Sequence, residues 1–449
     1  MYQDEYYILK ESGTYSNILE AFGLAVIFNY IFKEQHNSVK IIDTKTHYVI
    51  KLSNAVSKDL IENIKYSEFI PYIKYKDSPP ADSAFVDYEK LKSNKDIFQK
   101  FVSKEPKPTK AEIENFETKP DPYWDLYSNF NKLKALSAYK KIFFNIKSNQ
   151  DEFVEIIKTI LLLYSKLEDC STDAEKYLKK LEKGKRLQKL DKVNALQIFN
   201  PHQGKGVNAP KANSISLGGE SAFWLQEYLK IIGSYKSMLI RVVKVSNKTW
   251  DTKIYVIEPN EINYEFISKV FTEFRPTLKG SSSFKLDISS ILRFCQAFIK
   301  NIDEYKRQKP FLTFYNPQHS VNGFYTVYLK KLGTSESVSN LSFLQLPSFI
   351  NIESAEDCLI WEQIISEHLY IITHSELKEN GLGLEVLSLY RLFLTTSINE
   401  YLYLLLPKYN ILLMQSLVSK SKYRLKPFSQ NLLKELLILI LIGLLKFLR

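Results

Sequence analysis

The chain has 449 residues, which at about 150 residues per domain predicts two or three domains. It carries 61 Lys and Arg against 50 Asp and Glu, giving a net charge of +11, and only eight of the basic residues are Arg. Because 45% of the residues are hydrophobic and 14% are aromatic, the chain can build large cores, which excludes wholesale disorder.

Cysteine usage and the apolar runs bear on the compartment. Cys170, Cys295 and Cys358 lie too far apart for a CxxC pair, a four-cysteine zinc site or a disulfide framework, which predicts a reducing cytoplasm. Asp4 and Glu5 occupy the region where a signal peptide needs positive charge. The two uncharged apolar runs, 21–32 and 436–445, are shorter than the roughly 20 residues that span a bilayer. We therefore expect no membrane partner.

The first half of the chain mixes helical and strand patterns. Apolar residues at helical spacing predict a helix within 13–33, and two β-branched runs predict a hairpin over 39–52. Six of the sixteen prolines fall between residues 76 and 125, which predicts an extended connector or insertion. Helices are expected over 131–146 and 151–167.

The second half changes from strand to helix. Alternating β-branched residues on either side of 246–249 predict an antiparallel hairpin over 238–258. Bundle helices with short links are expected over 356–368, 384–394, 398–406 and 409–418. The predicted class is α+β: a mixed α/β body over 1–340 with antiparallel hairpins, and a helical-bundle lobe over 341–449.

A basic segment over 173–192 has the pattern of an amphipathic helix, broken only at Gly184. Its candidate phosphate-contacting cations are Lys176, Lys179, Lys180, Lys183 and Arg186. Two interpretations stay open: a solvated helix of mixed charge, or a helix laid along a phosphate backbone. The explanation of the net charge is also open. Binding to a polyanion is one explanation, and AT-rich coding is another, because it also gives a Lys-, Ile-, Asn- and Tyr-rich composition.

Motifs of common enzyme classes are missing from the sequence. The phosphate-loop pattern GxxxxGK[ST], the GxSxG elbow and HExxH do not occur, and the six histidines are scattered. We therefore expect no catalytic residues, no metal and no cofactor. One alternative is a nuclease whose carboxylates converge only in the fold, and another is a structural protein whose basic surface meets an acidic partner.

The segment 199–213 combines turn residues with side chains that can donate to phosphates or base edges. Gly204 and Gly206 permit close backbone approach, and Lys205 between them presents a cation. Asn and Gln amides can read base edges, whereas Lys contacts position a duplex. The candidate DNA-binding residues are Asn200, His202, Gln203, Gly204, Lys205, Gly206, Asn208, Lys211 and Asn213. An ordinary exposed loop can have the same composition.

Several stretches resemble the large-subunit family of type I CRISPR effector complexes (Cascade), in the branch labelled with the letter a of the Cas-eight group. They are Asn200 to Gly206 with Lys211, 223–229 (FWLQEYL), 366–369 (SEHL), 389–394 (LYRLFL), 398–401 (INEY), 409–414, 427–429 and 21–25 (AFGLA). The resemblance is diffuse and spans most of the chain. Two departures are the lack of the zinc-ribbon cysteines of some related subunits and an apolar tail after Ser429. That tail fits either an altered C-terminus or a genuine apolar helix docked in the bundle.

The resemblance implies a non-catalytic subunit that takes part in antiviral defence or guided transposition. Such a subunit binds guide RNA and target double-stranded DNA, helps to recognise the motif adjacent to the protospacer (the PAM), and aids R-loop formation. Its implied partners are the other Cascade subunits and a helicase-nuclease or a transposition factor. Pairing with the guide reads the long sequence in such systems, while protein reads a short duplex signal. A Lys-rich chain with few Arg suits backbone tracking better than bidentate guanine reading.

Overall fold

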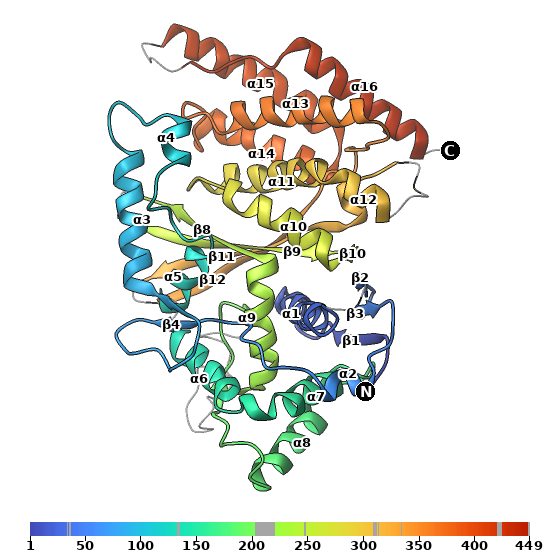
Figure 1. Cartoon of the computed structure of the whole chain (residues 1–449). Helices are drawn as coiled ribbons and strands as arrows, with labels where there is room; N and C mark the ends of the chain where they lie inside the picture. Colours follow the sequence, from blue (N-terminus) through green and yellow to red (C-terminus); the bar gives the residue numbers. More distant parts are fainter. Residues whose placement is uncertain are drawn as a thin grey trace. The chain divides into compact units, whose positions relative to one another are not determined.

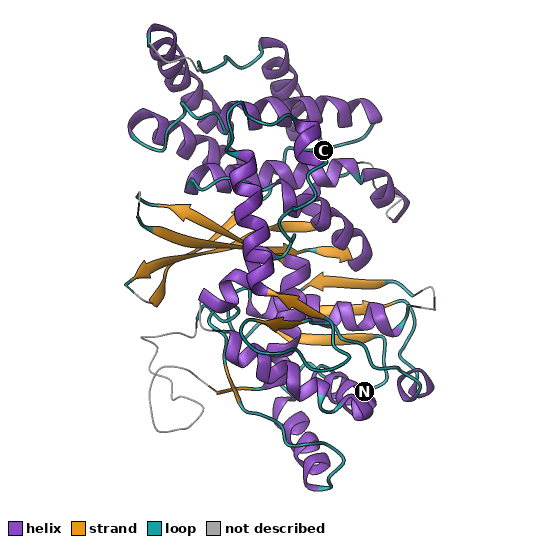
Figure 2. Cartoon of the chain, turned by 60° about the vertical axis from the view of Figure 1, so that its left-hand side comes forward, coloured by secondary structure: helices purple, strands orange, loops and turns teal. Residues whose placement is uncertain are grey.

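The computed structural model describes residues 1–447 except 34, 36, 133–134, 203–220, 247, 309–311, 313, 334 and 420–423. The chain forms two compact units: unit 1 comprises Met1–Ile240 with Leu332–Val338, and unit 2 comprises Arg241–Lys331 with Ser339–Arg449. Both units contain helices and strands (Figure 1; Figure 2). The predicted α+β class is confirmed.

Unit 1 is built on three strands and the helix that covers them. β3 (His47–Leu52) lies between β1 (Glu5–Leu9) and β2 (Val39–Asp43) and pairs antiparallel with both, so the predicted hairpin is confirmed. Alternate residues of these strands, such as Ile41 and Ile50, are buried. The next element, α1 (Ser16–Ile31), is apolar on nearly every side and packs against β2 and β3. A helix that is apolar all round needs cover on both sides.

The second cover of α1 is α9 (Trp224–Ser237), and two glycines set the closeness of this crossing. A Cβ atom added at Gly23 of α1 would lie 2.1 Å from the carbonyl oxygen of Leu229. One added at Gly233 of α9 would lie 1.9 Å from the carbonyl oxygen of Leu19. Because both neighbours are backbone atoms, neither position has room for a side chain.

Shorter elements complete unit 1. The further helices are α2 (Lys58–Glu62), α3 (Tyr88–Val102), α4 (Lys110–Glu114), α5 (Trp124–Lys132), α6 (Leu136–Lys147), α7 (Phe153–Leu163) and α8 (Ser171–Lys183). The further strands are β4 (Tyr72–Lys74) and β5 (Phe85–Asp87), which pair in parallel, and β6 (Val193–Asn194) and β7 (Ser221–Ala222). The helices predicted over 131–146 and 151–167 correspond to α6 and α7, each shorter than expected.

The proline-rich stretch 76–125 is folded rather than extended, because two local caps start helices inside it. The Asp87 side chain accepts from the amide of Lys90 at the start of α3. Thr109 and Glu112 form a capping box at the start of α4. The rings of Phe101 and Phe116 then stack with centroids 4.1 Å apart.

Unit 2 combines a four-stranded sheet with a set of helices. The sheet has the order β12-β11-β9-β8, formed by β12 (Ser335–Gln345), β11 (Val321–Leu332), β9 (Trp250–Pro259) and β8 (Met238–Lys244). The hairpin predicted over 238–258 is therefore present. A short strand β10 (Glu261–Asn263) and the helices α10 (Tyr264–Phe274), α11 (Ser283–Lys300) and α12 (Ile302–Gln308) lie between β9 and β11 in sequence.

The C-terminal helices belong to unit 2 together with its sheet. They are α13 (Ala355–Ile372), α14 (Gly381–Thr396), α15 (Asn399–Val418) and α16 (Gln430–Phe447). Because α13 and α14 both contact α11, the division between the units falls near residue 240 and not at the predicted residue 340. The helices predicted over 398–406 and 409–418 form the single helix α15, with Pro407 inside it.

In the described part of the chain, no helix combines the length and the apolar composition needed to cross a membrane.

Candidate nucleic-acid interface

The segment predicted to bind DNA, 199–213, lies in sequence between two short paired strands of unit 1. The short strands β6 and β7 pair antiparallel, with Val193 opposite Ala222 and Asn194 opposite Ser221, and so bring together the two ends of the stretch between them. Seven of the predicted residues fall outside the described residues: Gln203, Gly204, Lys205, Gly206, Asn208, Lys211 and Asn213. Asn200 and His202 are described.

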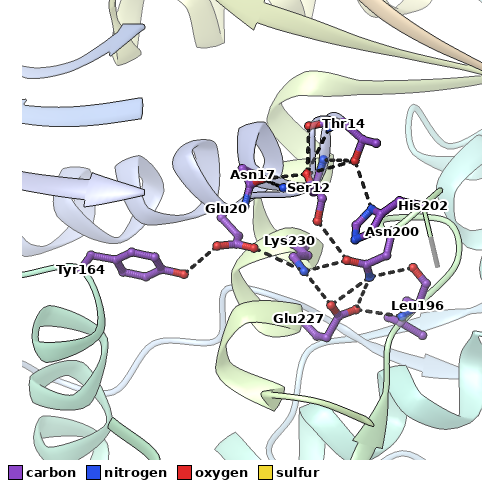
Figure 3. A network of polar contacts seen from close by, with 11 residues as sticks. Ser12, Thr14, Asn17, Glu20, Tyr164, Leu196, Asn200, His202, Glu227 and Lys230 are labelled. Atoms are coloured by element: carbon purple, nitrogen blue, oxygen red, sulfur yellow. Dashed lines mark hydrogen bonds and ion pairs between the residues drawn. The ribbon is translucent and has the colours of Figure 1, made fainter. Parts of the chain in front are cut away.

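Asn200 is the centre of a buried polar network (Figure 3). Its side chain is 1% exposed. The amide nitrogen donates to the carbonyl oxygen of Leu196 at 2.9 Å and to the two carboxylate oxygens of Glu227 at 2.9 and 3.1 Å. The amide oxygen accepts from the Ser16 hydroxyl at 2.9 Å and from the Lys230 ammonium at 2.8 Å.

These contacts change the role predicted for Asn200. Both polar atoms of its amide are engaged inside the protein, and the side chain is closed off from solvent. Asn200 therefore holds the chain at the entry to the segment instead of presenting a group to a base edge. Sequence alone does not separate these roles, because the same amide chemistry serves both.

Two glutamates, a lysine and a tyrosine complete the network. The Lys230 ammonium lies 2.9 Å from Glu227 Oε1 and 3.3 Å from Glu20 Oε1, and Glu227 also accepts from the Leu196 amide at 3.0 Å. The Tyr164 hydroxyl donates to Glu20 Oε2 at 3.1 Å. Glu20 comes from α1, whereas Glu227 and Lys230 come from α9, so the network ties both helices to Asn200.

The charges of this network depend on burial. Burial raises the pKa of Glu20 above its usual value, even though the neighbouring Lys230 ammonium favours the carboxylate. Burial opposes the charge of Lys230, but the carboxylates of Glu227 and Glu20 outweigh it and raise the Lys230 pKa. A buried charge is stable only when it is paired and hydrogen-bonded, which these contacts provide.

His202 lies at the edge of the network and is half-buried. Its Nδ1 is 3.3 Å from the Thr14 hydroxyl, which in turn donates to the Ser12 hydroxyl at 3.1 Å. The Ser12 hydroxyl also donates to Asn17 Oδ1 at 2.7 Å. His202 is thereby tied to the turn that precedes α1, and the chain is held at two side chains, Asn200 and His202, shortly before Gln203.

The predicted basic helix is shorter than its charge pattern suggested. α8 ends at Lys183 with Gly184 as its C-cap, and the residues after it are not helical. Acidic neighbours occupy three of its five candidate cations: Lys176 lies 3.5 Å from Asp173, Lys179 lies 3.0 Å from Glu175, and Arg186 lies 2.7 Å from Glu152. Lys180 and Lys183 are exposed and have no ion-pair partner among the described residues. These two can meet an external phosphate without breaking an internal pair.

A basic surface with an exposed aromatic ring in unit 2 was not predicted from the sequence. Trp250, at the start of β9, is 40% exposed, and the Lys244 ammonium of β8 lies 5.8 Å from its ring centroid. Lys330 and Lys331 of β11 are also exposed, and the Lys331 amide donates to Asp251, the residue after Trp250. The sequence signal that could have indicated this surface is Trp250, which lies beside the predicted hairpin turn at 246–249.

Within the residues that the structure describes, no group of three or more His, Cys, Asp and Glu side chains is arranged to hold a metal ion. A pocket beside the polar network, lined by residues that include Glu11, Glu20, Glu168 and Asp169, has a volume of ≈ 30 Å³. That volume suits a water molecule rather than an organic substrate.

Neither a scan of the sequence against protein-family models nor a search of curated proteins finds a match.

Proposed function

We propose that this chain is the non-catalytic large subunit of a guide-RNA-directed DNA surveillance complex of the Cascade type. In this role it binds the target duplex next to the protospacer through the 203–213 segment, aids R-loop formation and recruits an effector. Its partners are guide RNA, target double-stranded DNA, the other Cascade subunits and a helicase-nuclease or transposition factor. We further propose that the chain acts in the cytoplasm and uses no cofactor.

The observation that carries the proposal is the way in which the chain is held on both sides of the Gly204-Lys205-Gly206 sequence. Asn200 and His202 hold the entry, and the β6–β7 pair holds the exit. Buried hydrogen bonds to charged groups are among the stronger ones in proteins. A segment that reads DNA needs fixed attachment points of this kind, because its register on the duplex depends on where its ends are held.

Charge supplies the second support. The net charge of +11 attracts polyanions, and Lys180 and Lys183 stay available for phosphates. The sheet-end surface of Trp250 and Lys244 adds an aromatic ring beside a cation, a combination that also occurs where proteins contact unpaired bases. These features are general to nucleic-acid-binding proteins. The resemblance of 200–206 and 223–229 to the large-subunit family is what favours a guide-dependent complex.

The test is target binding by the reconstituted complex with Lys205→Ala in the large subunit. We expect a loss of affinity for duplex that carries the adjacent motif. Lys269→Ala is the matched control, because Lys269 is an exposed lysine of unit 2 paired with Glu304 at 2.9 Å. Equal affinity of the Lys205→Ala complex and the unsubstituted complex would remove the segment from the interface. DNA or RNA cleavage by the isolated chain with a divalent metal would instead support the nuclease alternative.

A further inference from the structure

The sheet of unit 2 leaves one tryptophan in solvent at the end of an otherwise buried strand. Trp250, the first residue of β9, is 40% exposed, whereas the seven residues that follow it are buried. β9 lies between β8 and β11 in the sheet (Figure 1). Tryptophan offers a large, flat surface for contact, and here a substantial part of that surface is open to a ligand.

The first of two lysines beside this ring comes from β8. The Val245 amide donates to the Thr249 carbonyl oxygen at 3.0 Å, which closes the β8–β9 turn and leaves Lys244 and Trp250 as the next facing residues. The Lys244 ammonium lies 5.8 Å from the centroid of the Trp250 ring. Facing residues of antiparallel strands have their Cβ atoms about 5 Å apart on one face of the sheet, so Lys244 lies beside the ring.

The second lysine comes from β11, on the other side of β9. Leu329 lies opposite Thr252 in the antiparallel β9–β11 pair, and side chains alternate between the two faces along each strand. Lys331 is two residues beyond Leu329 and Trp250 is two residues before Thr252, so Lys331 and Trp250 share a face. Lys330, the neighbour of Lys331, belongs to the opposite face.

The charges of these two lysines are not neutralised within the part of the chain that the structure describes. Lys244 and Lys331 are exposed and have no ion-pair partner there. Asp251, next to Trp250 in sequence, belongs to the other face and is 3% exposed. Its carboxylate accepts from the Tyr328 hydroxyl and from the Lys331 amide, both at 2.9 Å. The face of Trp250 therefore presents two available cations with an aromatic ring between them.

We propose that Lys244, Trp250 and Lys331, which we call the Trp250 face, bind an unpaired stretch of nucleic acid. One base stacks on the indole ring, and the two lysines contact the flanking phosphates. Every base has a flat face, so this kind of binding tolerates any sequence. A duplex cannot use the ring in this way, because its base faces are covered by the neighbouring base pairs. An acidic stretch of protein would pair with the lysines and leave the ring without a stacked base. The inference does not depend on the duplex-binding role proposed for the 203–213 segment.

The first test is anisotropy of labelled single strands of about 15 thymidylates or uridylates, near the largest site size of single-strand-binding folds. At least one is expected to bind the full chain, and the tighter one identifies DNA or RNA as the natural strand. Trp250→Ala is expected to raise the dissociation constant by about 5- to 150-fold, the contribution of one stacked base. Tyr403→Ala is the control, since Tyr403 is a 56% exposed ring on α15. Equal losses for the two variants overturn the proposal, as does equally tight binding of poly-glutamate.

The second test reads the stacking directly through tryptophan fluorescence. Trp224 and Trp361 are 6% and 1% exposed, so a base stacked on Trp250 is expected to quench an accessible part of the signal. Trp250→Phe keeps an aromatic ring at the site and is expected to bind with a smaller loss than Trp250→Ala, but without this quenching. Quenching of the same size in Trp250→Phe and in the unsubstituted chain would place the base elsewhere and overturn the proposal.

The third test uses the lysines and leaves Trp250 in place. Lys244→Ala and Lys331→Ala are each expected to reduce the slope of log binding constant against log salt by about 0.7, the contribution of one phosphate contact on a single strand. Lys330→Ala is the matched control, because Lys330 is an exposed lysine on the same strand and on the opposite face. A slope that Lys331→Ala leaves unchanged, or that Lys330→Ala reduces equally, contradicts the proposal. The duplex test of Lys205→Ala is separate, so either proposal can fail without the other.

Discussion

The side-chain amide of Asn200 donates to both carboxylate oxygens of Glu227, which is fully buried on α9. The same amide accepts from Lys230 through its oxygen, so one neutral side chain bridges a buried anion and a buried cation. The Asn200 amide thus joins Glu227 and Lys230 in one hydrogen-bonded group, and this group fixes the chain at the entry to the 203–213 segment.

Asn200→Ala is expected to destabilise unit 1 by about 2–3 kcal/mol, because Glu227 and Lys230 would each lose a buried partner. Urea unfolding measures this loss. Asn54→Ala is the control, since Asn54 is exposed and its hydrogen bonds to the described residue Asn37 use its backbone. A change for Asn200→Ala no larger than that for Asn54→Ala would contradict the network described above.

The crossing of α1 and α9 gives a second prediction. Gly23→Ala and Gly233→Ala each place a methyl group about 2 Å from a backbone oxygen, so the helices must separate. We expect losses above about 4 kcal/mol or failure to fold, which is typical of severe overpacking at a rigid contact. Gly184→Ala is the matched control, because its Cβ would meet the nearest oxygen at 3.3 Å. Circular dichroism melting curves of the three variants compare them directly.

The unpaired lysines of α8 predict a salt effect. Lys180→Glu with Lys183→Glu is expected to reduce the slope of log binding constant against log salt by about 1.8, since each phosphate contact contributes about 0.9 on duplex DNA. Lys176→Glu with Lys179→Glu should change the slope less, because those lysines already have acidic neighbours. Fluorescence anisotropy of a labelled duplex at several salt concentrations gives both slopes. Identical slopes for the two double variants would exclude α8 from the interface.

His368 makes stability depend on pH. Burial lowers the pKa of His368 to about 4 from its usual 6.5, and its Nε2 has no hydrogen-bond partner among the described residues. Because the folded state holds the neutral ring, the contribution of His368 is complete above pH 6.5. It is lost as the pH falls toward 4, and the loss is about 2 kcal/mol at pH 5.

The measurement is urea unfolding at pH 7.5 and pH 5. His368→Leu is expected to reduce the difference between the two pH values by about 2 kcal/mol, which is the contribution of this single group. His374→Gln serves as the control, because His374 is half-buried and lies outside the His368 contact with Tyr390. If His368→Leu and the unsubstituted chain lose the same stability at pH 5, the ring is not held neutral in the folded state.

Local patterns predicted local structure well. The apolar spacing around Ile18 and Leu24 gave α1, and the β-branched runs gave the β2–β3 pair, because each signal lies within a few residues. Proline was a poorer guide: Pro407 lies inside α15, where the prediction ended one helix and began another. Packing of the helix on α14 outweighs the local preference at this position.

Features that depend on distant residues were not predicted. The unit boundary near residue 240 results from contacts of α11 with α13 and α14, far along the chain. The sequence pattern indicated a solvent-facing amide at Asn200, because none of its partners is a near neighbour in the chain. Glu227 and Lys230 follow it on a later helix, and Ser16 precedes it by 184 residues. The sequence left open whether the cations of 173–192 are free for phosphates, and only coordinates reveal which of them already have acidic neighbours.

The β6–β7 pair and the Asn200 network hold the described residues on either side of 203–220. Closing a longer loop over the same fixed ends costs little extra entropy, since each doubling of length adds only about 0.6 kcal/mol. A segment of different length between these anchors is therefore expected to change the closure cost of unit 1 by little. Exchange of such segments offers a route by which one framework could acquire new recognition preferences.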